Sequence, residues 1–194
     1  MSDRLRLFVA AYPPAEHAEA MLAALRRLPL SRHREVAAAH VHMTLQFIGE
    51  RSARELDGVL ESVERSCSGI GAFSLMPREL ITLPERGAPR LVAAETDAPA
   101  GLLEVHSRLA HRLAREPRRN ASDRFRPHLT LCRFARDERP PRVSAPLDLP
   151  PFAVDRVRLM RSILKADGAE HAEVAAFPLD EPRPQTRSER TGGA

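Results

Sequence analysis

A short pattern of residues occurs twice in this chain and limits how it can fold. His42-Met43-Thr44-Leu45 returns 86 residues later as His128-Leu129-Thr130-Leu131. Each copy begins an apolar run of strand-like composition, residues 41–48 and 128–134. Side chains two residues apart in a strand share a face. In each copy the histidine and the threonine therefore point one way, while the apolar residues between and after them can face a core.

The surroundings of the two copies also correspond. Each half of the chain reads as a strand, a helix that opens at a proline, a loop and the motif strand. The 86-residue offset carries Pro13 onto Pro99. The halves share little else, so we expect a structural duplication. It predicts two similar lobes related by a pseudo-twofold axis, with one His-Thr pair from each lobe facing a shared cleft. Two ordinary strands with a polar face are the simpler alternative.

Periodicity of the apolar residues places the remaining elements. Residues 52–55, Ser-Ala-Arg-Glu, have the form of a capping box in front of a helix. The expected strands cover residues 4–9, 90–95, 154–164 and 170–178, and residues 72–76 and 79–83 form two short strands or one bent strand. The expected helices cover residues 18–28, 56–63 and 99–113. The last two strands form a hairpin about Asp167-Gly168. We expect one α+β domain over residues 1–180 and a disordered tail over residues 181–194, which are polar.

Composition sets the broad class of the protein. The chain has 194 residues, of which 43% are hydrophobic and 29% charged, as in soluble globular proteins. No apolar run approaches the length of a membrane span, and the polar N-terminus lacks the core of a signal peptide. We therefore expect a cytoplasmic protein, with no membrane partner, that acts as a monomer. The net charge of +4 permits an anionic partner such as RNA.

The repeated residue types suit phosphodiester chemistry. An imidazole is the side chain whose unperturbed pKa allows it to act as acid or base near neutral pH. Two of them can divide the work, one taking a proton from the nucleophile and the other giving one to the leaving oxygen. A threonine hydroxyl two residues away can hydrogen-bond a phosphoryl oxygen without adding charge.

With both motifs placed, the chain resembles the 2H phosphoesterases, specifically the bacterial RNA 2′,3′-cyclic phosphodiesterases, also called 2′-5′ RNA ligase-like proteins. The residues that carry the resemblance extend beyond the two tetrapeptides. They are Arg4-Leu5-Arg6-Leu7-Phe8-Val9-Ala10, Gln46-Phe47-Ile48-Gly49-Glu50, Phe125-Arg126-Pro127, Cys132-Arg133 and Val157-Arg158-Leu159-Met160-Arg161-Ser162. The resemblance implies a bilobal α+β fold in which antiparallel sheets line a central cleft and helices pack outside.

The resemblance also implies an activity and roles for residues. It implies opening of an RNA 2′,3′-cyclic phosphate to a 2′-phosphate without metal or other cofactor, and in reverse ATP-independent 2′-5′ joining of RNA ends. By motif match, His42 is the proton donor and His128 the proton acceptor. Thr44 and Thr130 bind phosphate oxygens, and Arg133 corresponds to an arginine in relatives. The alternatives are a phosphodiesterase of small cyclic nucleotides or 2′-5′ oligonucleotides, and an RNA-binding module without catalysis.

Several further residues have two interpretations. Regular alternation puts Arg133 on the face of Leu129 and Leu131, away from the cleft unless the strand bulges, and puts Cys132 where it could approach the cavity. It also puts His40 on the face of His42. Three further groups have a structural interpretation. His106 is expected at the edge of the core, Phe47 and Phe125 are expected to pack in the core, and His17, His33, His111 and His171 are expected at the surface.

One strand departs from the family. Relatives often carry an aromatic residue in the strand occupied here by Arg90-Leu91-Val92, and this chain has no tryptophan. Base stacking on that strand is therefore weakened. We expect phosphate and sugar contacts to outweigh recognition of the base.

Overall fold

The structure is a computed structural model that describes residues 4–114, 125–165 and 168–181. The strands are β1 (Arg4–Ala11), β2 (His33–Glu35), β3 (Met43–Ser52), β4 (Phe73–Leu75), β5 (Pro77–Leu83), β6 (Leu91–Thr96), β7 (His128–Phe134), β8 (Ser144–Pro146), β9 (Phe152–Val154), β10 (Arg156–Lys165) and β11 (Gly168–Pro178). The α-helices are α1 (Ala15–Leu25), α2 (Leu56–Cys67) and α3 (Ala100–Leu113), and 3-10 turns cover Ala38–His40 and Ala53–Glu55.

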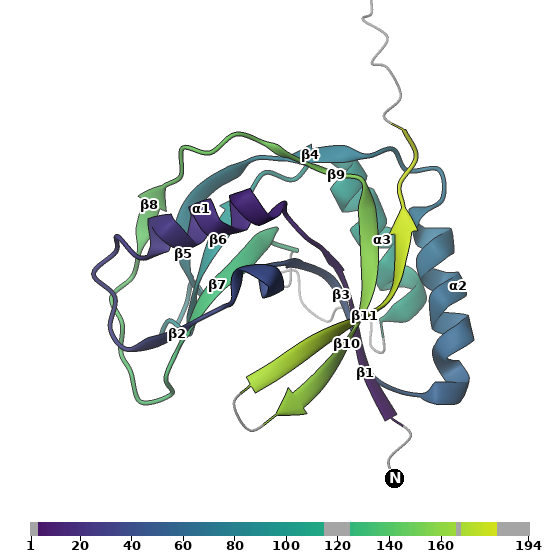
Figure 1. The fold of residues 1–194 in the computed structure, drawn as a ribbon, viewed down its shortest axis with the longest axis horizontal. Helices are drawn as coiled ribbons and strands as arrows, with labels where there is room; N and C mark the ends of the chain where they lie inside the picture. Colours follow the sequence, from purple (N-terminus) through teal and green to yellow (C-terminus); the bar gives the residue numbers. More distant parts are fainter. Residues whose placement is uncertain (1–3, 115–124, 166–167, 182–194) are drawn as a thin grey trace, which may run out of the picture.

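Two antiparallel sheets form the body of the fold (Figure 1). One has four strands in the order β11-β10-β1-β3, and the other has five in the order β2-β7-β6-β5-β8. A short β4-β9 ribbon lies between them at the top of Figure 1. The first motif continues into β3, at one edge of its sheet. The second motif opens β7, which lies inside the five-stranded sheet next to β6.

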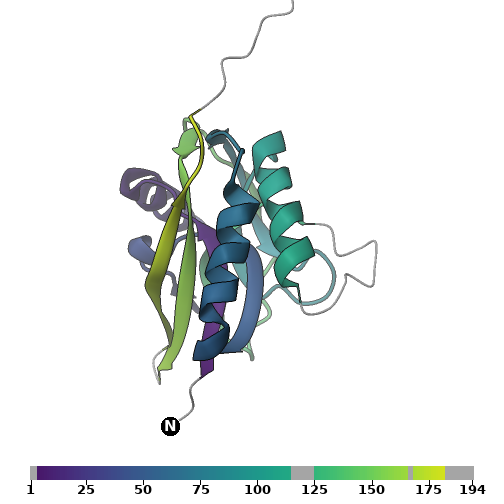
Figure 2. The same ribbon diagram turned by 90° about the vertical axis from the view of Figure 1, so that its right-hand side faces the viewer.

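In each half of the chain, the helix between the first strand and the motif strand packs against the sheet of the other half. Helix α3 follows β6 of the five-stranded sheet but packs on β3 of the four-stranded one. Helix α1 follows β1 of the four-stranded sheet but contacts β7. Helix α2 lies beside α3, as Figure 2 shows. This reciprocal packing matches the expected pseudo-twofold relation and ties the two motif strands into one structure.

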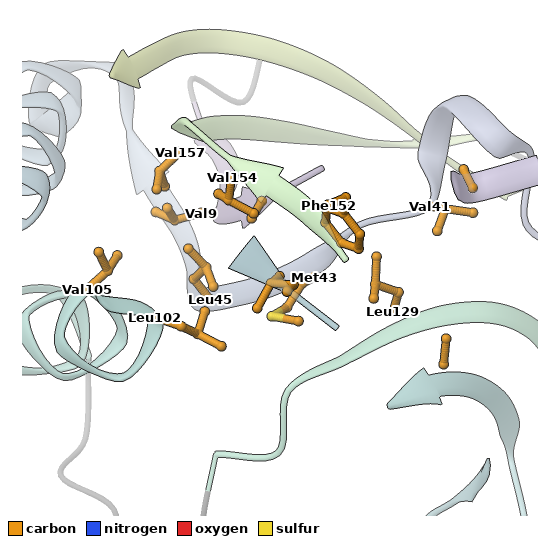
Figure 3. Packing of buried hydrophobic residues seen from close by; sticks show 14 of the residues in the cluster. Val9, Val41, Met43, Leu45, Leu102, Val105, Leu129, Phe152, Val154 and Val157 are labelled. Carbon is orange, nitrogen blue, oxygen red and sulfur yellow. The ribbon is translucent and has the colours of Figure 1, made fainter. Parts of the chain in front are cut away.

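A single large apolar cluster occupies the space between these layers. Figure 3 shows part of it, with Met43 and Leu45 of β3, Leu102 of α3 and Val154 of β9. All four side chains are at most 2% exposed. Burial of such side chains is the main favourable term in folding. The opposite face of the four-stranded sheet carries a second, smaller cluster that includes Phe8, Ala10 and Met160.

Most expected elements are present. The resemblance's α+β architecture with antiparallel sheets is confirmed, and Ser52 and Glu55 form the expected capping box. The segments 30–39 and 137–151, to which the sequence assigns neither a strand nor a helix, contain the short strands β2 and β8. Three parts of the expected layout lie outside the described residues: residues 118–122 of the loop before the second motif, Asp167 of the hairpin turn, and nearly all of the expected tail. In the described part of the chain, no helix is long and apolar enough to span a membrane.

Candidate active site

Both motif strands carry a bulge at the same position. In β3, Gln46 pairs with Val9 of β1 and Thr44 pairs with Ala10, so Leu45 is an extra residue. In β7, Cys132 pairs with Val92 of β6 and Thr130 pairs with Ala93, so Leu131 is the extra residue. The last residue of each H-x-T-L tetrapeptide is therefore bulged. A bulge adds one residue to one strand and shifts the alternation of every side chain after it.

The bulges decide which face the following residues occupy. Leu131 and Cys132 are both buried, and Arg133 returns to the side of His128 and Thr130 and is exposed. The expectation that Cys132 could approach the cavity is wrong, and Arg133 lies on the motif face because the strand is not regular. Phe47, which the 86-residue offset matches to Arg133, is likewise turned outward and 51% exposed. Its expected place in the core is wrong for the same reason.

The two imidazoles are held by the same contact. Nδ1–H of His42 donates to the carbonyl oxygen of His40 at 2.7 Å, and Nδ1–H of His128 donates to that of Arg126 at 2.8 Å. A carbonyl can only accept, so the contact fixes the proton on Nδ1 in each neutral ring. Nε2 is then the ring nitrogen left for chemistry in both histidines.

Aromatic rings surround His42. Its ring centroid lies 5.1 Å from that of Phe8, 5.4 Å from that of Tyr12 and 5.2 Å from that of His171. Burial lowers the pKa of His42 to about 4, although the hydrogen bond to the His40 carbonyl acts in the opposite direction. His42 is therefore neutral at pH 7 in the free protein.

Charged groups surround His128. Glu95 of β6 lies opposite His128 in the ladder, and Arg126 makes ion pairs with both Glu95 and Glu85. Burial lowers the pKa of His128 as well, and the positive charges of Arg126 and Arg133 act in the same direction. Arg133 also lowers the pKa of His42. One guanidinium thus acts on both imidazoles, and the two motif strands β3 and β7 contact each other.

A shallow recess lies next to this site on the five-stranded sheet. It is lined by Glu79, Ile81, Thr82, Glu85, Arg126, Arg142, Val143 and Ser144. Arg126 therefore belongs both to the wall of the recess and to the turn that holds His128. Apart from Arg126, the residues of the recess come from β5 and β8 and the segments beside them. Several lining groups are already paired: the Ser144 hydroxyl donates to Glu79 at 2.8 Å, the Val143 N–H donates to the Thr82 hydroxyl at 3.2 Å, and Arg126 makes an ion pair with Glu85.

Several side chains outside the motifs take positions that the sequence did not predict. His171 of β11, expected at the surface, is half-buried and contacts the rings of His42, His40 and Phe8. His40 lies in a 3-10 turn rather than in a strand, so alternation does not place it. His17 packs on Phe152 with a side chain only 14% exposed. Tyr12 could have been found, because it continues the alternating series Arg4, Arg6, Phe8, Ala10.

The described ranges contain no group of three His, Cys, Asp or Glu side chains that could hold a metal ion. The arrangement can instead supply proton transfer from two imidazoles and hydrogen bonds to an anion from two hydroxyls and a guanidinium. Thr44 is exposed, and Thr130 and His128 are partly exposed, so these groups are open to a ligand.

Comparison with known proteins gives consistent results. The family model for the 2'-5' RNA ligase superfamily matches residues 13–165. An RNA 2',3'-cyclic phosphodiesterase of Thermus thermophilus is 30% identical over 183 residues, covering 90% of each chain. A protein of the same name from Escherichia coli is 31% identical over 140 residues, covering 70% of this chain and 75% of the relative.

Solved structures agree with the sequence comparisons. The crystal structure of TT0787 from Thermus thermophilus has a TM-score of 0.75 at 29% identity and covers 92% of this chain and all of that one. The crystal structure of Escherichia coli LigT complexed with 3'-AMP has a TM-score of 0.72 at 26% identity, over 92% of this chain and 99% of that one. The chain therefore belongs to the 2'-5' RNA ligase superfamily.

Proposed function

We propose that this protein hydrolyses RNA 2′,3′-cyclic phosphate ends to 2′-phosphates, with His42 and His128 as a metal-independent acid-base pair. The observation that carries the proposal is the matched presentation of the two imidazoles. Each has its proton fixed on Nδ1 by a carbonyl two residues earlier, and each stands beside a threonine on a bulged strand. The relatives named as RNA 2',3'-cyclic phosphodiesterases support the substrate class.

The reaction is a displacement at phosphorus. Nε2 of His128 takes a proton from water as the water oxygen forms a bond to phosphorus. The bond between phosphorus and O3′ breaks, and O3′ receives a proton from Nε2–H of His42. The products are a 2′-phosphate and a free 3′-hydroxyl, and the two imidazoles then exchange protons with solvent. With an RNA 5′-hydroxyl in place of the water, the same two groups would join RNA ends through a 2′-5′ bond. Nε2 of His128 would take the proton of the 5′-hydroxyl as its oxygen bonds to phosphorus, and O3′ would leave with the proton from His42.

The anion of the substrate has a part in this scheme. A neutral His42 cannot donate the required proton, and its pKa of about 4 keeps it neutral in the free protein. A phosphate anion bound beside it favours the imidazolium, because an opposite charge a few ångströms away raises the pKa of a histidine. The substrate therefore brings His42 into its donor state. Thr44, Thr130 and Arg133 would hold the phosphate oxygens and stabilise the charge that develops on them.

The recess beside His128 offers a place for the nucleoside that carries the cyclic phosphate. Leu91, in the strand where relatives often have an aromatic residue, pairs with Arg133 in the ladder. Leu91 can supply packing at that place in the sheet but no stacked ring. We also propose that the protein is located in the cytoplasm and is a monomer. Light scattering measures the oligomeric state.

The test is hydrolysis of an oligonucleotide with a 2′,3′-cyclic phosphate end in the presence of EDTA, with the product isomer assigned by NMR. We expect a 2′-phosphate, and a loss of several orders of magnitude in kcat for His42→Ala and for His128→Ala at unchanged folding. His33→Ala, at an exposed strand of the same sheet as His128, serves as the control. Turnover that EDTA abolishes would contradict the proposal, and RNA binding without turnover would favour the non-catalytic module.

A further inference from the structure

A buried histidine outside the two motifs contacts a residue in or next to each motif. His106 lies on α3, on the stripe that buries Leu102, Leu109 and Leu113 against the sheet, and only 6% of it is exposed. A buried imidazole must be hydrogen-bonded to be tolerated, and an apolar side chain would fill the same space at lower cost. The contacts of this ring therefore indicate why the position holds a histidine.

The first contact is with the bulge of the first motif. Nδ1–H of His106 donates to the carbonyl oxygen of Leu45 at 2.7 Å. Leu45 is the extra residue of β3, and the extra residue of a bulge is the one left out of the regular ladder. The bond from α3 thus comes from outside the sheet to the residue that follows Thr44 directly.

The second contact is with the segment that enters the second motif. The ring of His106 stacks on that of Phe125, with centroids 3.8 Å apart and planes inclined by 11°. The next residue is Arg126, whose carbonyl accepts the Nδ1–H bond of His128. His106 is therefore joined to the backbone beside Thr44 by a hydrogen bond and, through one stacked ring, to the peptide that orients His128.

We propose that His106 is a positioning residue that fixes the two catalytic motifs relative to each other. The inference rests on the proposed function. It explains why the position holds a histidine, since this side chain supplies both a donor and a flat ring. Leucine would supply neither, asparagine only the donor, and phenylalanine only the ring.

A loss of either contact has a predictable effect. Without the donor, the Leu45 carbonyl loses this hydrogen bond in a buried place, and the bulge that directly follows Thr44 can relax. Without the ring, Phe125 loses its stacking partner, and the Arg126 carbonyl is less firmly held under His128. Displacements of about 1 Å in a catalytic group can cost on the order of a hundredfold in rate.

The test uses three variants of the full chain and one control. His106→Ala removes both contacts, His106→Asn keeps a donor at the place of Nδ1, and His106→Phe keeps the ring. The control is Val63→Ala, a fully buried position on α2, a helix that packs on α3, β10 and β11. Its cavity should lower stability without touching either motif. All rates are expressed per folded molecule, with the folded fraction taken from denaturation curves.

For His106→Ala we expect kcat to fall about 10- to 100-fold while KM changes less than about threefold, since the phosphate-binding groups remain present. His106→Asn and His106→Phe should each recover part of the loss, and Val63→Ala should keep the wild-type kcat. If His106→Ala does not fold, the inference is tested by comparing kcat of His106→Asn and of His106→Phe with that of the wild type. The inference is overturned if the His106 variants keep the wild-type kcat, or if Val63→Ala loses as much.

A second readout does not depend on activity. ¹⁵N NMR of the imidazole rings reports which nitrogen of His128 carries the proton. We expect Nδ1–H in the wild type and in His106→Phe, and a mixture of tautomers in His106→Ala and His106→Asn. An unchanged His128 tautomer in these two variants overturns the link through Phe125. An inactive wild type overturns the proposed function instead, and the tautomer measurement still tests the inference.

Discussion

The two motif histidines share a backbone contact but not an environment. Rings of Phe8, Tyr12 and His171 surround His42, whereas the carboxylate of Glu95 faces His128 and raises the pKa that burial lowers. An environment that separates the pKa values of two titratable groups assigns them different roles. In the proposed reaction, the desolvated His42 therefore depends on a bound anion for its proton, and His128 acts as the base.

This difference predicts the pH dependence of the reaction. The pKa values in kcat/KM are those of the free protein, about 4 for His42 and below 6.5 for His128. As the pH rises, His42 loses the proton that O3′ needs. As it falls, His128 becomes protonated and cannot act as base. We therefore expect both limbs of the kcat/KM profile below pH 6.5, with the alkaline limb of kcat at higher pH because bound phosphate raises the pKa of His42.

Arg133→Gln provides the companion measurement. Removing this charge should raise the pKa of both histidines and shift both limbs of kcat/KM to higher pH, while the rate falls because a phosphate ligand is lost. Limbs that stay in place in this variant would show that Arg133 does not act on the imidazoles. A wild-type kcat/KM profile centred at pH 7 or above would contradict the desolvation of His42.

At this scale the sequence identified the repeated groups but not the faces of their neighbours. His42, Thr44, His128 and Thr130 follow from the pattern alone, because the histidine and threonine precede the bulge. Arg133 and Phe47 come after it, and strict alternation assigns both to the wrong face. A bulge depends on the pairing of β3 with β1 and of β7 with β6, which a local pattern does not contain.

The N-terminal turn of helix α3 lies so close to β4 that only glycine fits at one position without a neighbour moving. A Cβ atom built at Gly101 would lie 2.9 Å from Cδ1 of Phe73 in β4, whereas one at the exposed Gly58 of α2 meets nothing within 4 Å. Alanine in place of glycine inside a helix normally stabilises by about 0.5–1 kcal/mol. We expect that gain for Gly58→Ala. For Gly101→Ala we expect a net loss of about 1 kcal/mol, because the contact with Phe73 overpacks the core.

Urea denaturation of the two variants checks this pair, with kcat/KM of Gly58→Ala expected to remain at the wild-type value. Equal stabilisation by both substitutions would show that Phe73 moves aside at no cost.

The helices themselves were predictable from their apolar stripes and from the Ser52 capping box. The packing partners of the helices were not predictable, because no local feature of the α1 or α3 sequence indicates that each helix packs against the motif strand of the other half.

At the scale of the whole molecule, one histidine links the site to the stability of the fold. The crossed packing of α1 on β7 and of α3 on β3 closes the two sheets around a shared core, and the motif strands are part of that core. Burial of the two motif imidazoles is therefore a consequence of folding. A group whose pKa differs between the folded and unfolded states makes stability depend on pH.

The sign of this dependence follows from the direction of the pKa shifts. The unfolded chain binds a proton on His42 near pH 6.5, and the folded protein does so only near pH 4. Between these values the unfolded state holds more protons, so the free energy of unfolding should fall as the pH is lowered. The contribution of His42 is present in full above pH 6.5 and amounts to about 3 kcal/mol, lost by pH 4. His128 and His171, whose pKa values burial also lowers, act in the same direction.

Urea denaturation at pH 7, 6, 5 and 4 measures the effect in the wild type, in His42→Gln and in His111→Gln, which changes an exposed histidine of α3. We expect His42→Gln to flatten the curve below pH 6.5 and His111→Gln to leave it unchanged. Because the same desolvation sets the acidic kcat/KM profile, the two experiments must agree. A wild-type slope retained in His42→Gln would mean that this imidazole is solvated in the folded protein, and the need for a substrate anion to protonate it would then disappear.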